Sequence, residues 1–403
     1  MRKEDMDYDI YCGIDIGKGT HFLVAFEPVG EKRIMSCPLV QDEAEIRDVL
    51  VKLSKLGKVL VTVDQPGCIG RLVVSVAQEL GLDVAQIPPR TFKKAADTYG
   101  EAKSDARDAF VIADSSRTTP RMISPVKEHS EAMESVKALC SFRADAVKER
   151  TGCYNRLHDL LVKVSPPLEQ LFSGQALHGD LALCMLARYG GPLGLKHAGR
   201  ARVSKWAAGL KYQRTRGPRL VKKVFEALSK MTLVLPATAV IEDEIKRLAH
   251  RILELNALEG DLGAKIGLYA AIIPEVALLK SMPGMGDALA PAIVSEIGDI
   301  SRFSDDDHLA SYSGVAPVKK ESGTSLKGGK KTKGGNRRLK NALVQYAKIA
   351  CLHDLDAKAY YDKKRSQGKS HRQALLCLAR CRIKVIYALL KTGSFYEALP
   401  KAA

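Results

Sequence analysis

The stretch YCGIDIGKGTH, residues 11–21, reads as a buried β-strand that carries one charged residue. Tyr11, Ile14 and Ile16 favour burial, yet Asp15 stands between the two isoleucines. An ionised carboxylate is rarely buried unless it is paired or binds a metal ion. Asp15 is therefore predicted to be a functional residue at the end of the first strand, where a glycine-rich turn begins.

On both sides of Asp15, strand-like and helix-like patterns alternate up to about residue 125. The run Lys58–Val63 (KVLVTV) is almost wholly apolar, as in a strand whose sheet is covered on both faces. The pattern predicts an α/β domain with a mixed sheet over residues 8–125. Strands are expected over 11–15, 21–28, 34–40 (antiparallel to the second), 58–63 and 83–87, and helices over 42–56 and 70–80.

The rest of the chain is predicted to be mainly helical, in two further domains over residues 126–268 and 269–396. Apolar residues recur every seven positions from Met133 to Leu161, and Ile241 to Leu255 form a seam of about two heptads. Such a seam fits a coiled coil or a helix packed on its own domain. Residues 181–225 have no Asp or Glu and about ten Lys or Arg, so we expect a partly irregular segment that follows a phosphate backbone.

The composition favours an intracellular protein with a polyanionic partner. The chain has 63 Lys and Arg against 46 Asp and Glu, a formal net charge of +17. Its nine cysteines lack C-x-x-C spacing, so neither a disulfide framework nor a zinc site is expected. The polar N-terminus does not resemble a signal peptide, and no run approaches the roughly 18 apolar residues of a membrane span. We therefore expect a cytoplasmic protein without a membrane partner.

Three more carboxylates complete a candidate metal site with Asp15. Asp64 directly follows the strand KVLVTV, and Asp105 and Asp108 share one face of a helix for which Ser104 is a suitable N-cap. If that helix packs over the strand ends, the four oxygen ligands suit Mg²⁺ or Mn²⁺. Two such ions about 4 Å apart clamp both sides of a phosphodiester. Taken singly, Asp64 also fits a turn, and Asp105 and Asp108 a solvated helix start.

The C-terminal part combines a glycine turn with a basic loop. Pro283-Gly284-Met285-Gly286 between apolar stretches predicts a helix-hairpin-helix that binds phosphate, or else a plain turn. From Lys319 to Lys340, about nine basic residues surround Ser322 and Ser325. Composition alone fits a solvated basic loop. The residues predicted to bind nucleic acid are Lys18, Lys103, Arg200, Arg202, Lys205, Arg214, Arg216, Gly284, Gly286, Lys319, Lys320, Lys327, Lys330, Lys331, Lys333, Arg337 and Arg338.

These motifs together resemble the DEDD insertion-sequence transposases, which are related to Piv-type DNA invertases. Gly13-Ile14-Asp15 with Lys18 and His21 is similar to the first motif of their RuvC-like, RNase H-type domain, and Lys103–Ala109 to the third. At the second motif this chain departs from the family, because Asp64 stands where Glu is usual. The C-terminal matches follow in the family's order: Pro283–Gly286, Glu296–Asp299, Arg302-Phe303, Ser313–Pro317, Ser322-Gly323, Gly335–Leu339 and Gly368-Lys369.

The resemblance implies a RuvC-like N-terminal domain, a helical and partly coiled-coil insert, and a mainly α C-terminal transposase domain. It implies that Ser322 is the nucleophile, with Ser325 as a nearby competitor, and that the acidic residues bind Mg²⁺ or Mn²⁺. We expect Arg337 and Arg338 to serve as auxiliary phosphate clamps. It further implies donor and target DNA, a structured noncoding bridge RNA as guide, and dimers or tetramers that share the active site, in a prokaryotic cell at the nucleoid.

Three other functions fit parts of the sequence. A metal-only RuvC-like endonuclease uses water as the nucleophile, so Ser322 is then structural. An actin-like or sugar-kinase-like ATPase shares a first phosphate loop similar to GIDIGKGTH, but its second phosphate loop and adenosine motif are not found in this chain. A non-catalytic nucleic-acid-binding protein explains the charge of the chain but leaves the four carboxylates without a role.

Overall fold

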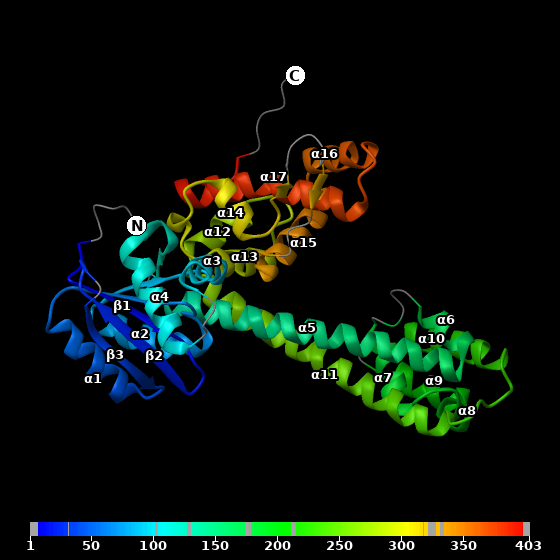
Figure 1. Ribbon diagram of the computed structural model, residues 1–403. Helices are drawn as coiled ribbons and strands as arrows, with labels where there is room; N and C mark the ends of the chain where they lie inside the picture. Colours follow the sequence, from blue (N-terminus) through cyan, green and yellow to red (C-terminus); the bar gives the residue numbers. More distant parts are fainter. Residues whose placement is uncertain are drawn as a thin grey trace, which may run out of the picture. The chain divides into compact units, whose positions relative to one another are not determined.

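The computed structural model describes residues 7–30, 32–100, 104–126, 130–173, 177, 179–210, 215–316, 318–320, 328–330 and 334–397. The chain forms two compact units (Figure 1). The first contains the chain up to Ser130 together with Asp299–Ser304, and the second contains Glu131–Gly298 and the chain from Asp305 onward. The second unit thus holds most of both regions expected to be separate helical domains, and the three-domain division stays a prediction.

A mixed six-stranded sheet forms the centre of the first unit, with the strand order β3-β2-β1-β4-β5-β6. Strands β1, β4 and β5 are parallel, whereas β2, β3 and β6 run antiparallel to their neighbours. The strands are β1 (Ile10–Asp15), β2 (Thr20–Phe26), β3 (Arg33–Val40), β4 (Val59–Val63), β5 (Asp83–Gln86) and β6 (Ser124–Pro125). The mixed sheet and its first five strands confirm the prediction; the short strand β6 was not expected.

Helices cover both faces of this sheet. Side chains alternate between the faces of a strand, so Ile10, Cys12 and Ile14 of β1 join the apolar core formed with α1 and α2. Tyr11 instead packs against Ile112 on the opposite face. The helices are α1 (Glu43–Ser54), α2 (Arg71–Glu79), α3 (Pro89–Ala96) and α4 (Asp105–Thr118). Every residue of β4 is buried, as the run KVLVTV predicts.

Helix α4 lies directly on β1 at Gly13. A Cβ atom at Gly13 would stand 2.3 Å from the Ala113 nitrogen and 2.5 Å from the Ala109 oxygen. Both are backbone atoms of α4, so they cannot move aside by a rotamer change. Because residues two apart share a face of a strand, Asp15 is on the same side of the sheet as Gly13 and α4.

Gly13→Ala is expected to lower the free energy of unfolding by about 2 kcal/mol, because the added methyl group forces α4 away from β1. Urea unfolding followed by circular dichroism measures this change. Gly19→Ala is the matched control, since a Cβ atom at Gly19 meets nothing within 4 Å. Equal stability of the two variants would show that α4 tolerates displacement from the strand.

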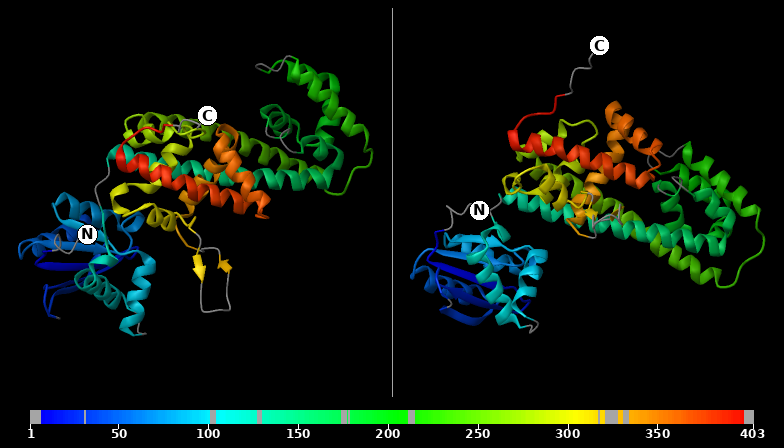
Figure 2. Two further views of the ribbon diagram at one scale, coloured as in Figure 1. Left: turned by 90° about the horizontal axis from the view of Figure 1, so that it is seen from above. Right: turned by 45° about the horizontal axis from the view of Figure 1, so that its top comes forward.

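The second unit is organised around two long antiparallel helices, α5 (Glu131–Val164) and α11 (Thr238–Ala270), which lie side by side (Figure 2). Arg143 pairs with Glu259 at 2.6 Å and Glu149 with Arg251 at 2.8 Å. The heptad residues of α11 from Ile245 to Leu255 are buried in a core shared with α5 and the short helices near them, and Ile241 is partly buried against it. In the described chain, therefore, the predicted seam packs against its own domain.

The expectation of a partly irregular segment at 181–225 is wrong for its described residues, which are mainly helical. Glycines at 190, 191, 199 and 209 lie between or at the ends of short helices and hide the periodicity in the sequence. Trp206 packs edge-on to Tyr189, with 5.3 Å between the ring centroids. The helices here are α6 (Pro166–Phe172), α7 (Asp180–Tyr189), α8 (Pro192–Ala198), α9 (Arg200–Ala208) and α10 (Arg216–Ser229).

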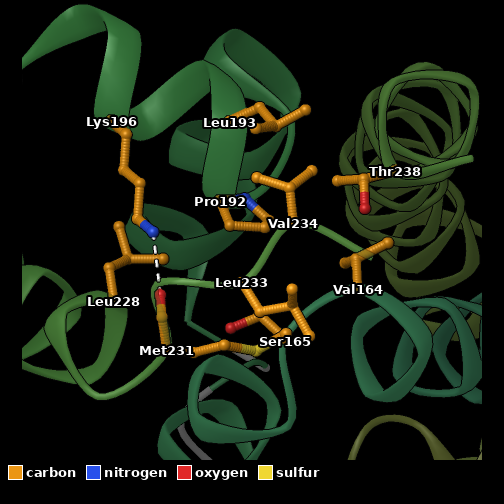
Figure 3. Close-up of a pocket in the computed structure, with 10 residues that line it drawn as sticks. All are labelled: Val164, Ser165, Pro192, Leu193, Lys196, Leu228, Met231, Leu233, Val234 and Thr238. Atoms are coloured by element: carbon orange, nitrogen blue, oxygen red, sulfur yellow. Dashed lines mark hydrogen bonds between the residues drawn. The ribbon is translucent and has the colours of Figure 1, made fainter. Parts of the chain in front are cut away.

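A small pocket lies among the end of α5, α8, α10 and the start of α11 (Figure 3). Its volume is about 10 Å³, which corresponds to about one water molecule. The buried Ser165 hydroxyl at its wall has no hydrogen-bond partner among the described residues, whereas Lys196 Nζ donates to the Met231 carbonyl at 2.9 Å. The pocket therefore suits one buried water and is too small for a substrate.

The remaining elements of the second unit include the glycine turn. Helices α12 and α13 flank it, as expected for a helix-hairpin-helix, and a two-stranded antiparallel sheet follows. The elements are α12 (Pro274–Lys280), α13 (Leu289–Ile297), α14 (Asp306–Tyr312), β7 (Val318–Lys320), β8 (Gly328–Lys330), α15 (Arg337–His353), α16 (Leu355–Ser366) and α17 (His371–Thr392). None of the described helices is by itself long and apolar enough to cross a membrane.

Candidate functional site

Asp15 and Asp64 end two neighbouring parallel strands. Ile14 of β1 is in register with Val63 of β4, so the next residues along the two strands are the two aspartates. Asp64 Oδ1 accepts a hydrogen bond from the Ile16 amide at 3.3 Å. The carboxyl ends of parallel strands meet at one edge of a sheet, and the structure thus brings these two predicted ligands together.

The first turn of α4 carries the other two predicted ligands. Ser104 caps the helix as expected, with its hydroxyl accepting from the Arg107 amide at 3.2 Å. Asp108 is 8% exposed and lies 3.4 Å from the Arg107 guanidinium, whereas Asp105 is exposed. Asp108 immediately precedes Ala109, whose carbonyl faces Gly13 of β1.

The four carboxylates do not form a closed cluster. Within the described ranges, no three His, Cys, Asp or Glu side chains are gathered closely enough to hold a metal ion. The expected convergence of all four is therefore not observed. Asp15 and Asp64 nevertheless fit Mg²⁺, which is commonly held by one or two protein carboxylates and keeps several waters.

Burial raises the pKa of the Asp64 carboxyl above its ordinary value. Hydrogen bonds from the Gln65 side chain, at 3.2 Å, and from the Ile16 amide lower it, but burial is the larger effect. The folded chain therefore holds a proton on Asp64 at a higher pH than the unfolded chain does. A divalent cation favours the ionised carboxylate, so its binding releases this proton.

Asp64→Asn is expected to raise the melting temperature of the metal-free protein at neutral pH. The stability contributed by the Asp64 proton is complete below the ordinary carboxyl pKa and is lost as the pH rises through the raised pKa. Asn stays neutral, and its amide oxygen still accepts from Ile16. Thermal unfolding in EDTA from about pH 4 to about pH 8 should show a difference from the parent that grows toward neutral pH. A difference that grows toward acid would contradict the assignment.

A chain of hydrogen bonds connects the loops that follow the two aspartates. The Gly17 amide donates to His21 Nδ1 at 3.2 Å, and His21 Nε2 contacts Gln41 Oε1. Gln41 Nε2 donates to the Ile69 carbonyl at 2.7 Å. Because Nδ1 accepts, the ring proton is on Nε2. His21 is 2% exposed. Its imidazole stands in the apolar stretch THFLVAF, and this is the feature of the sequence that indicates a role in the hydrogen-bond chain. Gln41 gave no such signal.

The described basic residues predicted to bind nucleic acid are mostly at the surface. Lys18 is exposed in the turn after Asp15. Gly286 is exposed, but a Cβ atom at Gly284 would lie 3.1 Å from Ile349 of α15, so Gly284 serves packing within the protein. The exposed cations on helices are Arg200, Arg202 and Lys205 of α9, Arg216 of α10, and Arg337 and Arg338 of α15. Lys319 and Lys320 belong to β7, and Lys330 to β8.

Ser322 is in the segment that joins β7 to β8. Lys320 pairs with Gly328 at the last register position of this hairpin. The segment is part of the second unit, whereas Asp15, Asp64, Asp105 and Asp108 belong to the first. Several predicted site residues lie outside the described residues: Lys103, Arg214, Ser322, Ser325, Lys327, Lys331 and Lys333.

Comparison with known proteins identifies the family. A family model described as "Transposase" matches residues 12–166, and one described as "Transposase IS116/IS110/IS902 family" matches residues 276–362. The insertion element IS110 protein of Streptomyces coelicolor is 37% identical over 399 residues, which cover 97% of this chain and 96% of that protein. The chain belongs to the IS110 family of transposases. The resemblance to DEDD insertion-sequence transposases is thereby confirmed.

Two other relatives extend the comparison of this transposase. The IS900 protein of Mycobacterium paratuberculosis is 30% identical over 97% of this chain and 98% of its own length. The pilin gene-inverting protein of Moraxella bovis is 29% identical over 157 residues, which are 38% of this chain and 46% of that protein. A transposase acts on DNA, and its DEDD nuclease domain implies a divalent metal ion.

Proposed function

We propose that this transposase cuts and rejoins donor and target DNA through a covalent phosphoserine link at Ser322. Asp15, Asp64, Asp105 and Asp108 would hold divalent ions, Mg²⁺ by preference, beside the reacting phosphate. The observation that carries the proposal is the pairing of Asp15 with Asp64 at adjacent strand ends. It is supported by the buried Asp108 in the first turn of α4, the helix that packs on β1 at Gly13.

The proposed reaction is a phosphoryl transfer in two steps. The Ser322 oxygen attacks phosphorus, an Oγ–P bond forms, one DNA ester bond breaks, and the serine proton passes to solvent as the leaving strand takes up a proton. A strand hydroxyl then attacks the phosphoserine, reforms a DNA ester bond and returns the serine. The phosphoserine link conserves the bond energy, so no ATP is needed. A divalent ion, when bound, neutralises charge on the transferring phosphoryl group. Arg337 and Arg338 would contact its oxygens.

The active site would be shared between subunits. The carboxylates and the serine segment belong to different units of the chain, and this division supports a site built from the carboxylates of one subunit and the serine of another. A dimer or tetramer is then required for activity.

A structured noncoding RNA would guide the choice of DNA. Base pairing then supplies the sequence specificity, while the protein contacts backbone and shape. The exposed cations of α9 and α10, Arg200, Arg202, Lys205 and Arg216, are candidates for these backbone contacts. RNase treatment of the purified complex should abolish site-specific cutting if the RNA is required.

The decisive experiment is detection of the covalent intermediate. The protein is purified with the RNA and flanking DNA of its element, incubated with labelled DNA in Mg²⁺, denatured and digested with protease. Mass spectrometry should find DNA attached to the peptide that contains Ser322. An adduct on Ser325 would move the assignment to that residue. Cleavage with free ends and no attached peptide would support the alternative, a metal-only RuvC-like endonuclease.

A further inference from the structure

We infer that Asn336 is a positioning residue, which fixes the base of the segment carrying Ser322 through its hydrogen bond with Glu296. The inference rests on the role proposed for Ser322. It adds a second requirement for formation of the adduct. Besides the Ser322 hydroxyl, the reaction needs a segment whose attachment to α14 and α15 is fixed.

The two ends of the serine segment meet. Gly314 and Gly335 have φ of +68° and +101°, and a Cβ atom on Gly335 would lie 2.6 Å from the Gly314 nitrogen. A Cβ atom on Gly314 would stand equally close, at 2.6 Å, to the Gly334 oxygen. The Asn336 amide donates to the Tyr312 carbonyl at 2.7 Å. The chain therefore leaves α14 and enters α15 at one place, which is the base of the serine segment, residues 315–334.

Asn336 uses both ends of its side-chain amide at this place. Nδ2 donates to Glu296 Oε2 at 2.6 Å and to the Tyr312 hydroxyl at 3.2 Å. Oδ1 accepts from the amides of Arg338 and Leu339, each at 3.0 Å, and so caps α15. One residue thus connects the last turn of α13, the end of α14 and the start of α15. Asp caps a helix equally well but has no donor for a carboxylate.

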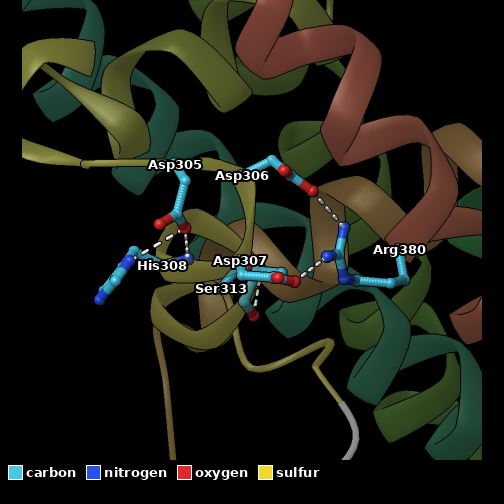
Figure 4. A network of polar contacts seen from close by, with 7 residues as sticks. Asp305, Asp306, Asp307, His308, Ser313 and Arg380 are labelled. Carbon is cyan, nitrogen blue, oxygen red and sulfur yellow. Dashed lines mark hydrogen bonds and ion pairs between the residues drawn. The ribbon is translucent and has the colours of Figure 1, made fainter.

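Helix α14, which ends at this junction, is held by ion pairs with α17. Arg380 of α17 pairs with Asp306 at 2.9 Å and with Asp307, both in the first turn of α14 (Figure 4). Asp305 caps the same helix by accepting from the His308 amide at 2.8 Å. At its other end the buried Ser313 hydroxyl donates to the Ala310 carbonyl at 3.0 Å. The start of α14 is therefore tied to α17, and its end, next to Gly314, is closed by the Ser313 hydrogen bond.

The test exchanges the partners of the hydrogen bond. Asn336→Asp keeps the cap of α15 but places a second carboxylate against Glu296. The double variant Asn336→Asp with Glu296→Gln restores the bond with its donor and acceptor reversed. Asn341→Asp, at an exposed position of α15, introduces the same charge away from the junction and is the control. All variants are assayed at about pH 8, well above the ordinary pKa of a carboxyl group.

We expect Asn336→Asp to slow formation of the Ser322 adduct by about 100-fold, since small displacements of a reacting group cost about this much. The double variant should recover to within about threefold of the parent. Amide hydrogen exchange at 318–320 and 328–330 should accelerate in Asn336→Asp alone, with no change in α5 or α11. An unchanged adduct rate and exchange in Asn336→Asp, or a double variant as slow as the single one, would overturn the inference.

Exchange measurements separate this inference from the proposed function. If Ser322 is not the nucleophile, no variant forms the adduct, but Asn336→Asp still accelerates exchange in β7 and β8 and the double variant still reverses it. If Ser322 is the nucleophile and Asn336 does not position it, the adduct forms at the same rate in all four proteins.

Discussion

Ser322→Ala is expected to abolish the covalent DNA–protein adduct and to lower recombination on the order of 10⁶-fold, the usual cost of removing a catalytic nucleophile. The methyl group of Ala offers no oxygen to phosphorus, and water cannot preserve the energy of the broken ester bond for rejoining. Excision and insertion are measured with a donor plasmid that carries the element, and the adduct by gel shift after denaturation.

Ser325→Ala is the matched control for this loss. It removes a hydroxyl from the same basic segment, three residues along the chain, and should retain both adduct and recombination. Both variants should bind DNA like the parent, with the same salt dependence, because neither removes a cation. Full recombination by Ser322→Ala would refute the nucleophile assignment, and loss only in Ser325→Ala would transfer it.

Asp15→Asn is expected to slow strand cleavage by about 10³-fold, because a metal ion at the reacting phosphate contributes several kcal/mol and each 1.4 kcal/mol is a factor of ten. The amide is nearly the same size as the carboxylate but carries no charge for the cation. Mg²⁺ should also stop raising the melting temperature of the variant, which tests ion binding without any reaction.

Asp83→Asn is the control for Asp15→Asn. Asp83 begins β5, at the opposite end of the parallel strands, and accepts a hydrogen bond from the Tyr8 hydroxyl at 2.9 Å that Asn can also accept. It should leave both cleavage and the effect of Mg²⁺ unchanged. A mixture of Asp15→Asn and Ser322→Ala subunits should regain part of the activity if the site is shared. Cleavage by Asp15→Asn at the parental rate would remove Asp15 from the metal site.

Local patterns were sufficient to predict most of the first unit, although not α3 or β6. The apolar run at 58–63 is a fully buried strand, and Ser104 caps the helix that carries Asp105 and Asp108. Both features depend on neighbouring residues only. The helices of residues 181–225 were missed because glycines divide them into pieces too short for a helical period to be recognised.

The site could be predicted only in part, because some of its contacts join residues that are far apart in the chain. The pairing of Asp15 with Asp64 follows from parallel strands of matched length, which the alternating pattern suggests. The contact of Gln41 with His21 depends on the register of β2 with β3, and that of Asn336 with Glu296 spans 40 positions of the chain. No periodicity or motif reports such distances, so these partners become visible only in the folded chain.

The meeting of Gly314 and Gly335 has a consequence for how such transposases diversify. Because the segment starts and ends at one point, insertions or deletions within it leave the spacing of α14 and α15 unchanged. Doubling the length of a flexible loop costs only about 0.6 kcal/mol. We therefore expect that replacing the segment with that of a relative preserves folding when the two glycines and Asn336 are kept.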